Sequence, residues 1–317
     1  MKVKPDLFKG ARAVLMFYSK HWISLLQLLF AMFLLTLIPG LSAFAGEWED
    51  GLAAYQNGYF DRAFNLLLPL AEAGNPDAMD ILSDMHIFGE GREVNYQAAF
   101  YWSSKSAALG SAEGQNSVAT AYASGQGVQA DRQEALRWYH LAASGGNAKA
   151  RISLARRYLY GEDVLRDVGL GLTYLFAAVD QGQDRAQLAL SRNIRFGEFE
   201  LQRDLQEANR LLTLSADQGN VAAQISLAVV YADGMGVAAD RVEAAKWYVI
   251  ASRRGCLAAL IRYLRLTPRL SAEQEKEAQA RAEAWWSSHS NRDRREFHDG
   301  LVGNECYQEP PEDQPTS

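Results

Sequence analysis

Residues 119–146 read ATAYASGQGVQADRQEALRWYHLAASGG, and this stretch decides the fold. Its first part is an alanine-rich helical pattern that ends at Gly125, a residue type that tolerates the left-handed backbone found just past helix ends. Asp131 then stands where its side chain can accept hydrogen bonds from the first N–H groups of a second helix. Alanines and Trp138 recur along that second segment at helical spacing. The stretch therefore predicts two short helices, helix A and helix B, joined by a turn.

The same pattern recurs along the chain with a period of 36 residues. A column of glycines marks the end of each unit at intervals of 36, 36, 36, 37 and 36 residues: Gly74, Gly110, Gly146, Gly182, Gly219 and Gly255. A column of small residues on helix A keeps the same phase: Ala78, Gly114, Ala150, Ala186 and Ala223. Several columns in one register predict five full helix–turn–helix units.

The sizes of the repeated side chains explain why the units must stack. Small residues let two helices approach closely, and large ones fill the space between one unit and the next. A single unit cannot bury its own apolar face, so it needs neighbours. We therefore predict an all-α fold, an α-solenoid superhelix of antiparallel helix pairs. The in-phase tryptophans, together with His86 in a mostly aromatic column, are assigned to the core: Trp102, Trp138 and Trp247.

At these residues the chain resembles the Sel-1-like repeat family, a relative of the tetratricopeptide family, over roughly residues 47–290. Units three and four depart from the family pattern, because Asp163 and Phe199 stand where the turn normally carries a second glycine. The resemblance implies a right-handed superhelix whose concave face, lined by helix A, binds proteins. Family members in bacterial envelopes act as adaptors, or as partners of cell-wall and polysaccharide machinery.

Five segments are expected along the chain. An export segment, residues 1–45, is followed by N-terminal capping helices over 46–77. Five Sel-1-like repeats occupy 78–256, and C-terminal capping helices occupy 257–290. The remaining residues, 291–317, form a mostly disordered tail, because the end of the chain is rich in proline and acidic residues.

The first 45 residues have the order of a secretory signal. Five basic residues and one acid precede an apolar run, and Ala43-Phe44-Ala45 follows a Pro-Gly pair. We expect cleavage near Ala45, which makes the protein periplasmic or secreted. The alternative is an uncleaved inner-membrane anchor facing the periplasm, because residues 22–44 approach the ~20 residues that span a bilayer.

Charge and motif content exclude several function classes. Without residues 1–45 the chain has 27 basic and 37 acidic residues, a net charge of −10, so no nucleic-acid partner is expected. No catalytic motif or metal-ligand spacing is recognisable, and we expect no enzyme activity, metal or cofactor. Cys256 and Cys306 can pair in an oxidising compartment, and the sequence leaves open whether they do.

Arginines gather on helix A of units three and four, against the acidic background. Arg156 and Arg192 occupy the same repeat position, 36 residues apart, so stacking should place them side by side. An anionic partner between them would remove their mutual repulsion. The candidate partner-binding residues are Arg151, Arg156, Arg157, Arg192 and Arg195. The alternative is a set of solubilising charges paired with nearby acids: Glu162, Asp163 and Asp184.

Three functions follow from these patterns. The leading hypothesis is a non-catalytic envelope scaffold that binds a protein partner on the concave helix-A face. The alternative is a binder of an anionic cell-wall or exopolysaccharide glycan at the arginines. A weak hydrolase is the third hypothesis, and it ranks last because no nucleophile–base or acid pair is visible.

Overall fold

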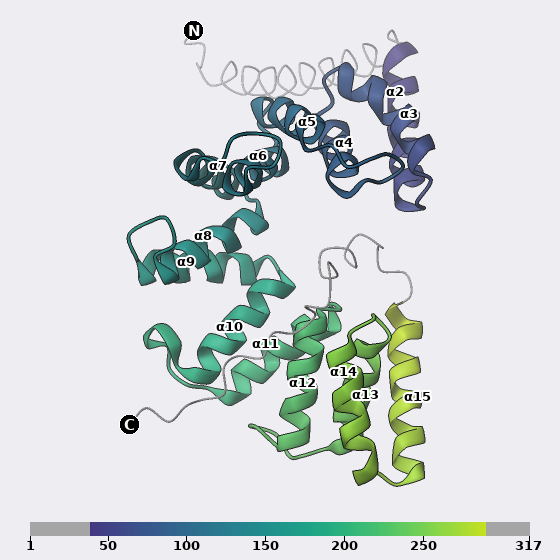
Figure 1. Cartoon of the computed structure of the whole chain (residues 1–317), viewed down its shortest axis with the longest axis vertical. Helices are drawn as coiled ribbons and strands as arrows, with labels where there is room; N and C mark the ends of the chain where they lie inside the picture. Colours follow the sequence, from purple (N-terminus) through teal and green to yellow (C-terminus); the bar gives the residue numbers. More distant parts are fainter. Residues whose placement is uncertain (1–38, 290–317) are drawn as a thin grey trace, which may run out of the picture. The chain divides into compact units, whose positions relative to one another are not determined.

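The computed structural model describes residues 39–289 of the chain (Figure 1). This described part contains fourteen α-helices and no β-strand, and consecutive helices pack against each other as pairs. The predicted all-α solenoid of antiparallel helix pairs is therefore confirmed. The chain divides into two compact units, which meet in sequence at Gly74 and Asn75.

The first unit contributes α2 (Pro39–Gln56) and α3 (Phe60–Glu72) to the described residues. Gly51 allows the two helices to approach closely, because a Cβ atom there would lie 2.8 Å from Leu67. Tyr55 packs edge-on against Phe60, with 5.8 Å between ring centroids, and Leu67 is fully buried. α2 continues without interruption past Ala45, the predicted cleavage site.

The second unit holds the repeats. Each repeat is one helix A followed by one helix B, and Figure 1 shows these pairs succeeding one another along the chain. Repeats one to five are the pairs α4 (Pro76–Phe88) and α5 (Tyr96–Ala108), α6 (Ala112–Ser124) and α7 (Arg132–Ser144), α8 (Ala148–Tyr160) and α9 (Val168–Asp180), α10 (Asp184–Phe196) and α11 (Leu205–Asp217), and α12 (Val221–Asp233) and α13 (Arg241–Ser252). They are followed by α14 (Leu257–Leu266) and α15 (Ala272–His289), and two 3-10 turns interrupt the series, η1 (Glu198–Glu200) and η2 (Thr267–Arg269).

Helix ends lie where the repeat pattern predicts them. In every helix B the residue before the first turn accepts hydrogen bonds from backbone N–H groups through its side chain: Asn95, Asp131, Asp167, Asp204 and Asp240. Each helix A ends at a glycine in the left-handed conformation: Gly89, Gly125, Gly161, Gly197 and Gly234. These local rules fix the length of all ten helices to within a residue of one another.

Repeats three and four keep the left-handed turn without its second glycine. In repeat two that glycine is Gly127, where a Cβ atom would overlap the carbonyl oxygen of Tyr96. Asp163 and Phe199 adopt the same conformation, with φ of 62° and 56°, although side chains rarely do. Asp163 forms an ion pair with Arg132 at 3.0 Å, and the ring of Phe199 packs edge-on against Tyr160. Contacts between repeats thus hold the strained turns.

The small-residue column lies at the centre of the core. Its four alanines are fully buried, and at Gly114 a Cβ atom would lie 2.8 Å from the backbone nitrogen of Ala107. Trp102 and Trp247 are buried as predicted, whereas Trp138 and His86 are only half-buried. Trp285 of α15 packs edge-on against Trp247, with ring centroids 6.1 Å apart, so α15 covers the end of the array.

Three sequence predictions involve residues outside the described part, and one of them, the disordered tail over 291–317, lies wholly outside it. Cys256, just before α14, is buried and disulfide-bonded, and Cys306, the sequence's other cysteine, lies outside the described part. Most of the predicted export segment, residues 1–38, also lies outside it. Between residues 39 and 289, no helix has both the length and the apolar character that crossing a membrane requires.

The different burial of the tryptophans predicts different costs of truncation. Trp247→Ala should lower the free energy of unfolding by ~3–5 kcal/mol, because the indole is only 2% exposed and contacts Trp285. Trp138→Ala should cost less, because its side chain is half-buried. Urea unfolding followed by circular dichroism measures both, with Phe176→Ala on the exposed side of α9 as control. Equal costs for the two tryptophans would contradict this core assignment.

Candidate partner-binding site

Each helix A presents one row of side chains outside the fully buried core, although Val229 in the row of α12 packs against that core. The second, ninth and thirteenth residues of the helix share this row, because seven and eleven residues are close to two and three helical turns. All of them are exposed or half-buried. We call this surface the helix-A face: Asp77, Asp84 and Phe88 on α4; Glu113, Thr120 and Ser124 on α6; Lys149, Arg156 and Tyr160 on α8; Arg185, Arg192 and Phe196 on α10; Ala222, Val229 and Asp233 on α12.

Contacts between repeats join these rows into one surface. Lys149 Nζ lies 3.2 Å from a carboxylate oxygen of Glu113, which occupies the same position one repeat earlier. Arg192 donates a hydrogen bond of 2.7 Å to the hydroxyl of Tyr160 on the preceding helix A. Equal positions therefore lie next to each other at Glu113 and Lys149, whereas Arg192 contacts the thirteenth position of the preceding helix A; that Arg156 and Arg192 lie side by side stays a prediction.

The five predicted arginines separate into two groups. Arg156 and Arg192 lie on the helix-A face with about half of each side chain exposed, and each has a glutamate within reach, Glu162 at 3.3 Å and Glu198 at 4.0 Å. The other three make contacts within the array and do not join that row.

Each of the other three arginines contacts a neighbouring residue within the array of repeats. Arg157 is buried, with its guanidinium 4.6 Å above the ring of Tyr139. Arg195 donates a hydrogen bond of 2.9 Å to the side chain of Asn209, and Arg151 donates to the carbonyl of Ala143. These contacts serve packing between helices, so Arg156 and Arg192 are the two candidates placed to meet a partner.

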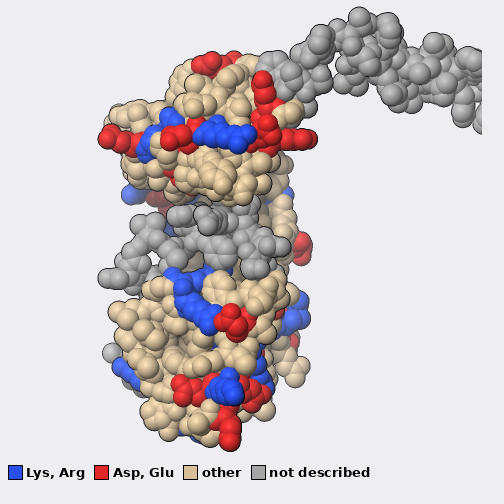
Figure 2. Space-filling view, turned by 90° about the vertical axis from the view of Figure 1, so that its right-hand side faces the viewer, with Lys and Arg blue, Asp and Glu red and all other residues tan. Residues whose placement is uncertain are grey.

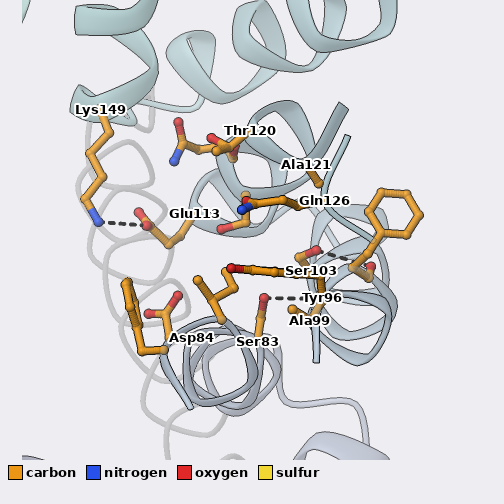
Figure 3. A pocket seen from close by; sticks show the side chains of 15 residues that line it. Ser83, Asp84, Tyr96, Ala99, Ser103, Glu113, Thr120, Ala121, Gln126 and Lys149 are labelled. Atoms are coloured by element: carbon orange, nitrogen blue, oxygen red, sulfur yellow. Dashed lines mark hydrogen bonds and ion pairs between the residues drawn. The ribbon is translucent and has the colours of Figure 1, made fainter. Parts of the chain in front are cut away.

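A pocket of about 170 Å³ opens on the helix-A face between repeats one and two (Figure 3). Figure 3 shows Asp84, Glu113 and Lys149 grouped on one side of it. Apolar walls come from α4 and α5: Ile87, Phe88, Tyr96 and Phe100. This pocket was not predicted from the sequence, although Asp84 is an acidic residue at the repeat position that Arg156 and Arg192 occupy.

Burial dominates the electrostatics of the pocket. It raises the pKa of Asp84 to about 7, which Lys149 opposes and which Glu113, Asp80 and Glu90 reinforce. Burial also raises the pKa of Asp80 to about 6, although the Ser111 hydroxyl donates a 2.6 Å hydrogen bond to it. A carboxylate with a pKa perturbed by burial is typical of functional sites, and purely structural charge networks perturb pKa values too.

Three of the hydroxyl groups around the pocket are engaged in structural hydrogen bonds. Ser83 donates to the carbonyl of Ala99, Ser103 to that of Phe100, and Thr120 to that of Asn116. In each of these three bonds the hydroxyl donates to a backbone carbonyl, which serves the helices and not a reaction.

A second polar arrangement, which the sequence analysis also missed, bridges repeats two and three. His140 on α7 forms hydrogen bonds of 3.0 Å with the Tyr158 hydroxyl and 3.1 Å with the Tyr174 hydroxyl. Burial lowers the pKa of His140, which favours the neutral ring. The two tyrosine rings stack with centroids 6.1 Å apart. This group connects three helices and is explained by packing.

Charges on the opposite end of the array are paired locally. On α13 and α15, Glu243 binds both Lys246 at 2.7 Å and Arg281 at 3.0 Å, and Arg281 also binds Glu277. Figure 2 shows basic and acidic side chains next to each other in this way on the face that it draws. On the helix-A face, Lys149 pairs with Glu113 of the preceding repeat, whereas Arg156 and Arg192 pair with glutamates of their own repeats.

The sequence matches the Sel1 repeat family over residues 76–111, 112–147, 148–183, 184–220 and 221–256. The chain therefore belongs to the Sel1 repeat family. A Sel1 repeat protein from Oxalobacter formigenes is similar in structure, with a TM-score of 0.62 and 23% identity, over 76% of this chain and 98% of that one. An immunity protein from Pseudomonas aeruginosa has a TM-score of 0.48 and 20% identity, over 80% and 88%. None of the curated proteins compared with the sequence matches it.

Family membership gives the function in outline. Sel1 repeat proteins are generally protein-interaction scaffolds, and the family is typically non-catalytic. The Oxalobacter formigenes protein is less than 25% identical to the chain, so the similarity supports the fold alone, and the partner must be argued from the chain's own residues.

The raised pKa of Asp84 predicts a stability that depends on pH. Between about pH 4 and pH 7 the folded chain keeps the proton and the unfolded chain loses it, so the stability contributed by Asp84 falls as the pH rises through this range. Asp84→Asn should therefore raise Tm at pH 8 by at least ~2–4 °C, the equivalent of about 1 kcal/mol in a chain of this size. At pH 4 the two proteins should melt alike.

Calorimetry at both pH values tests this, and Asp77→Asn is the matched control, because Asp77 is an exposed carboxylate on the same helix. A variant at Asp84 that melts lower than the wild type at pH 8 would show that the ionised carboxylate stabilises the fold.

Proposed function

We propose that this chain is a scaffold of the cell envelope that binds a protein partner through the helix-A face. The observation that carries the proposal is the aromatic column of the helix-A face, in which the thirteenth residue of helix A is an exposed aromatic side chain in three of the five repeats. Phe88, Tyr160 and Phe196 are 49%, 48% and 51% exposed. Aromatic residues are enriched at the centres of protein interfaces, and here they stand in line with charged residues that could orient a partner.

The proposed envelope location is supported by two features. The first 45 residues have the order of a secretory signal. Cys256 is disulfide-bonded, and disulfides persist mainly in oxidising compartments such as the bacterial periplasm. Both features favour a periplasmic or secreted protein, or one anchored in the inner membrane through residues 22–44 if the segment stays uncleaved.

An anionic glycan is the alternative occupant. Arg156 and Arg192 are exposed on neighbouring repeats and could bind carboxylate or sulfate groups. The aromatic column and the acidic pocket at repeats one and two favour a protein, because a polyanion would be repelled by Asp84 and Glu113.

Site-specific photo-crosslinking in cells tests the proposed face. A photoreactive amino acid at Tyr160 or Phe196 should capture one defined protein, whereas the same group at Phe176, exposed on helix B, should not. Arg156→Glu with Arg192→Glu should reduce the capture. Arg137→Glu with Arg210→Glu is the matched control, because these helix-B arginines are similarly exposed, also pair with glutamates and change the net charge equally.

Equal capture from Phe176 would exclude the helix-A face as the partner site. Loss of every crosslink after digestion of envelope glycans would favour the glycan alternative.

The export proposal has its own measurement. Mass spectrometry of the protein from its native cell should find a chain that begins at Gly46, in the periplasmic or secreted fraction. An intact N-terminus in the membrane fraction would support the anchor, and an intact chain in the cytoplasm would rule out export.

A further inference from the structure

The charges of the helix-A face are segregated along the repeats. The ninth residue of helix A changes from an acid to two bases along the array: Asp84, Thr120, Arg156, Arg192 and Val229. The second residue changes at the same place: Asp77, Glu113, Lys149, Arg185 and Ala222. Repeats one and two are thus acidic on this face, repeats three and four are basic, and repeat five is uncharged at both positions.

Acid and base meet at the boundary between repeats two and three, where Lys149 lies 3.2 Å from Glu113. Asp84 and Arg192 stand on helices α4 and α10, with two further helices A between them. Separated fields of this kind select the charge pattern of a ligand and steer it during encounter.

The acidic end has the form of a pocket for one cationic side chain. Its 170 Å³ greatly exceed the ~10–15 Å³ that a single water needs. Apolar walls from Ile87 and Phe100 suit the aliphatic stem of a lysine or arginine, which packs well on apolar surface. The carboxylates of Asp84 and Glu113 could then bind the charged head in a charge-assisted hydrogen bond.

The free-energy cost of ionising the buried Asp84 carboxylate is consistent with a cationic ligand. Burial holds the pKa of Asp84 near 7, so the free chain gains little from ionising this group at neutral pH. Two acidic residues, Asp84 and Glu113, and one basic residue, Lys149, line the pocket, and Lys149 pairs with Glu113 at 3.2 Å, so a bound cation would add to the counter-charge beside Asp84.

The basic end presents guanidinium groups beside aromatic rings. Arg192 is hydrogen-bonded to Tyr160, so its planar group is held on the face, and Arg156 lies one turn before Tyr160 on α8. Carboxylate side chains of a partner could bind both arginines, with the neighbouring glutamates Glu162 and Glu198 giving way.

We propose that the helix-A face binds an extended segment of a partner protein with the matching charge polarity: a lysine or arginine side chain enters the pocket between repeats one and two, and carboxylates bind Arg156 and Arg192. This inference rests on the proposed protein-binding function and adds the chemistry of the partner to it.

Selection from a random 12-residue peptide library displayed on phage, with the full chain immobilised, tests the polarity. Enriched peptides should carry Lys or Arg toward one end and Asp or Glu toward the other. A synthetic peptide of an enriched sequence should bind at least ~10-fold more tightly than an isomer with alternating charges.

Charge variants identify which end of the face reads which end of the peptide. Arg156→Glu with Arg192→Glu should select peptides that are basic at both ends, a change of specificity that unfolding cannot produce. Asp84→Asn with Glu113→Gln should remove the basic preference alone. The helix-B controls, Arg137→Glu with Arg210→Glu and Glu134→Gln with Glu207→Gln, should select the same peptides as the wild type.

The proposed charge polarity would be overturned if the enriched peptides show no charge segregation, or if the wild type and both variants select the same peptides. Either result would leave the proposed protein-binding function standing. No enrichment at all would also overturn the polarity, and the photo-crosslinks then decide the proposed function separately. If the wild-type chain self-associates and the variant Arg156→Glu with Arg192→Glu does not, the occupant of the helix-A face is a second copy of the chain. If no peptide is enriched and polygalacturonate binds the wild type but not the variant Arg156→Glu with Arg192→Glu, the occupant of the face is a glycan.

Discussion

Close packing of successive helices through a column of alanine and glycine is the constraint on which the array of repeats depends. The alanines of this column have no exposed surface, and at Gly114 even one added carbon would meet the backbone of α5. Because these contacts are so close, a helix A can pack against its neighbouring helices in only one register. Once that register is set, equal positions of the repeats become neighbours, and a column in the sequence becomes a row on the surface.

Rows of this kind give a repeat protein its means of recognition. The core positions are nearly the same in every repeat, so stability places few demands on the exposed row, and its residues can differ from repeat to repeat. Here the differences are ordered, from acids on α4 and α6 to bases on α8 and α10. The half-buried Asp84, which burial keeps from ionising readily, lies within this row and outside the core. Both features fit a surface shaped by a ligand better than one shaped by solubility.

Much of the fold could be predicted from the sequence, because it depends on local rules. Gly125 ends a helix by its own backbone freedom, and Asp131 begins the next by its own side chain. The site was only partly predictable. Arg156 and Arg157 are adjacent in sequence, yet one is exposed and the other lies over Tyr139, since one residue turns the helix by 100°.

The remaining features of the site depend on contacts between repeats, which a pattern within one repeat does not contain. The pocket needs residues from four helices, and the bridge at His140 needs hydroxyls from two others. Asp163 and Phe199 also depend on contacts that the pattern within one repeat does not contain. The family pattern predicts a glycine at their position, and partners in adjacent segments, Arg132 and Tyr160, accompany its replacement.

The central claim is that a partner segment lies along the helix-A face, and hydroxyl-radical footprinting with a bound selected peptide tests it most directly. Phe88, Tyr160 and Phe196 are exposed on that face, and Tyr101 and Phe176 are comparably exposed on helices B. If the claim is correct, the peptide protects the first three from oxidation and leaves the other two as reactive as in the free chain. Protection of Tyr101 and Phe176, with Phe88, Tyr160 and Phe196 still reactive, would contradict it.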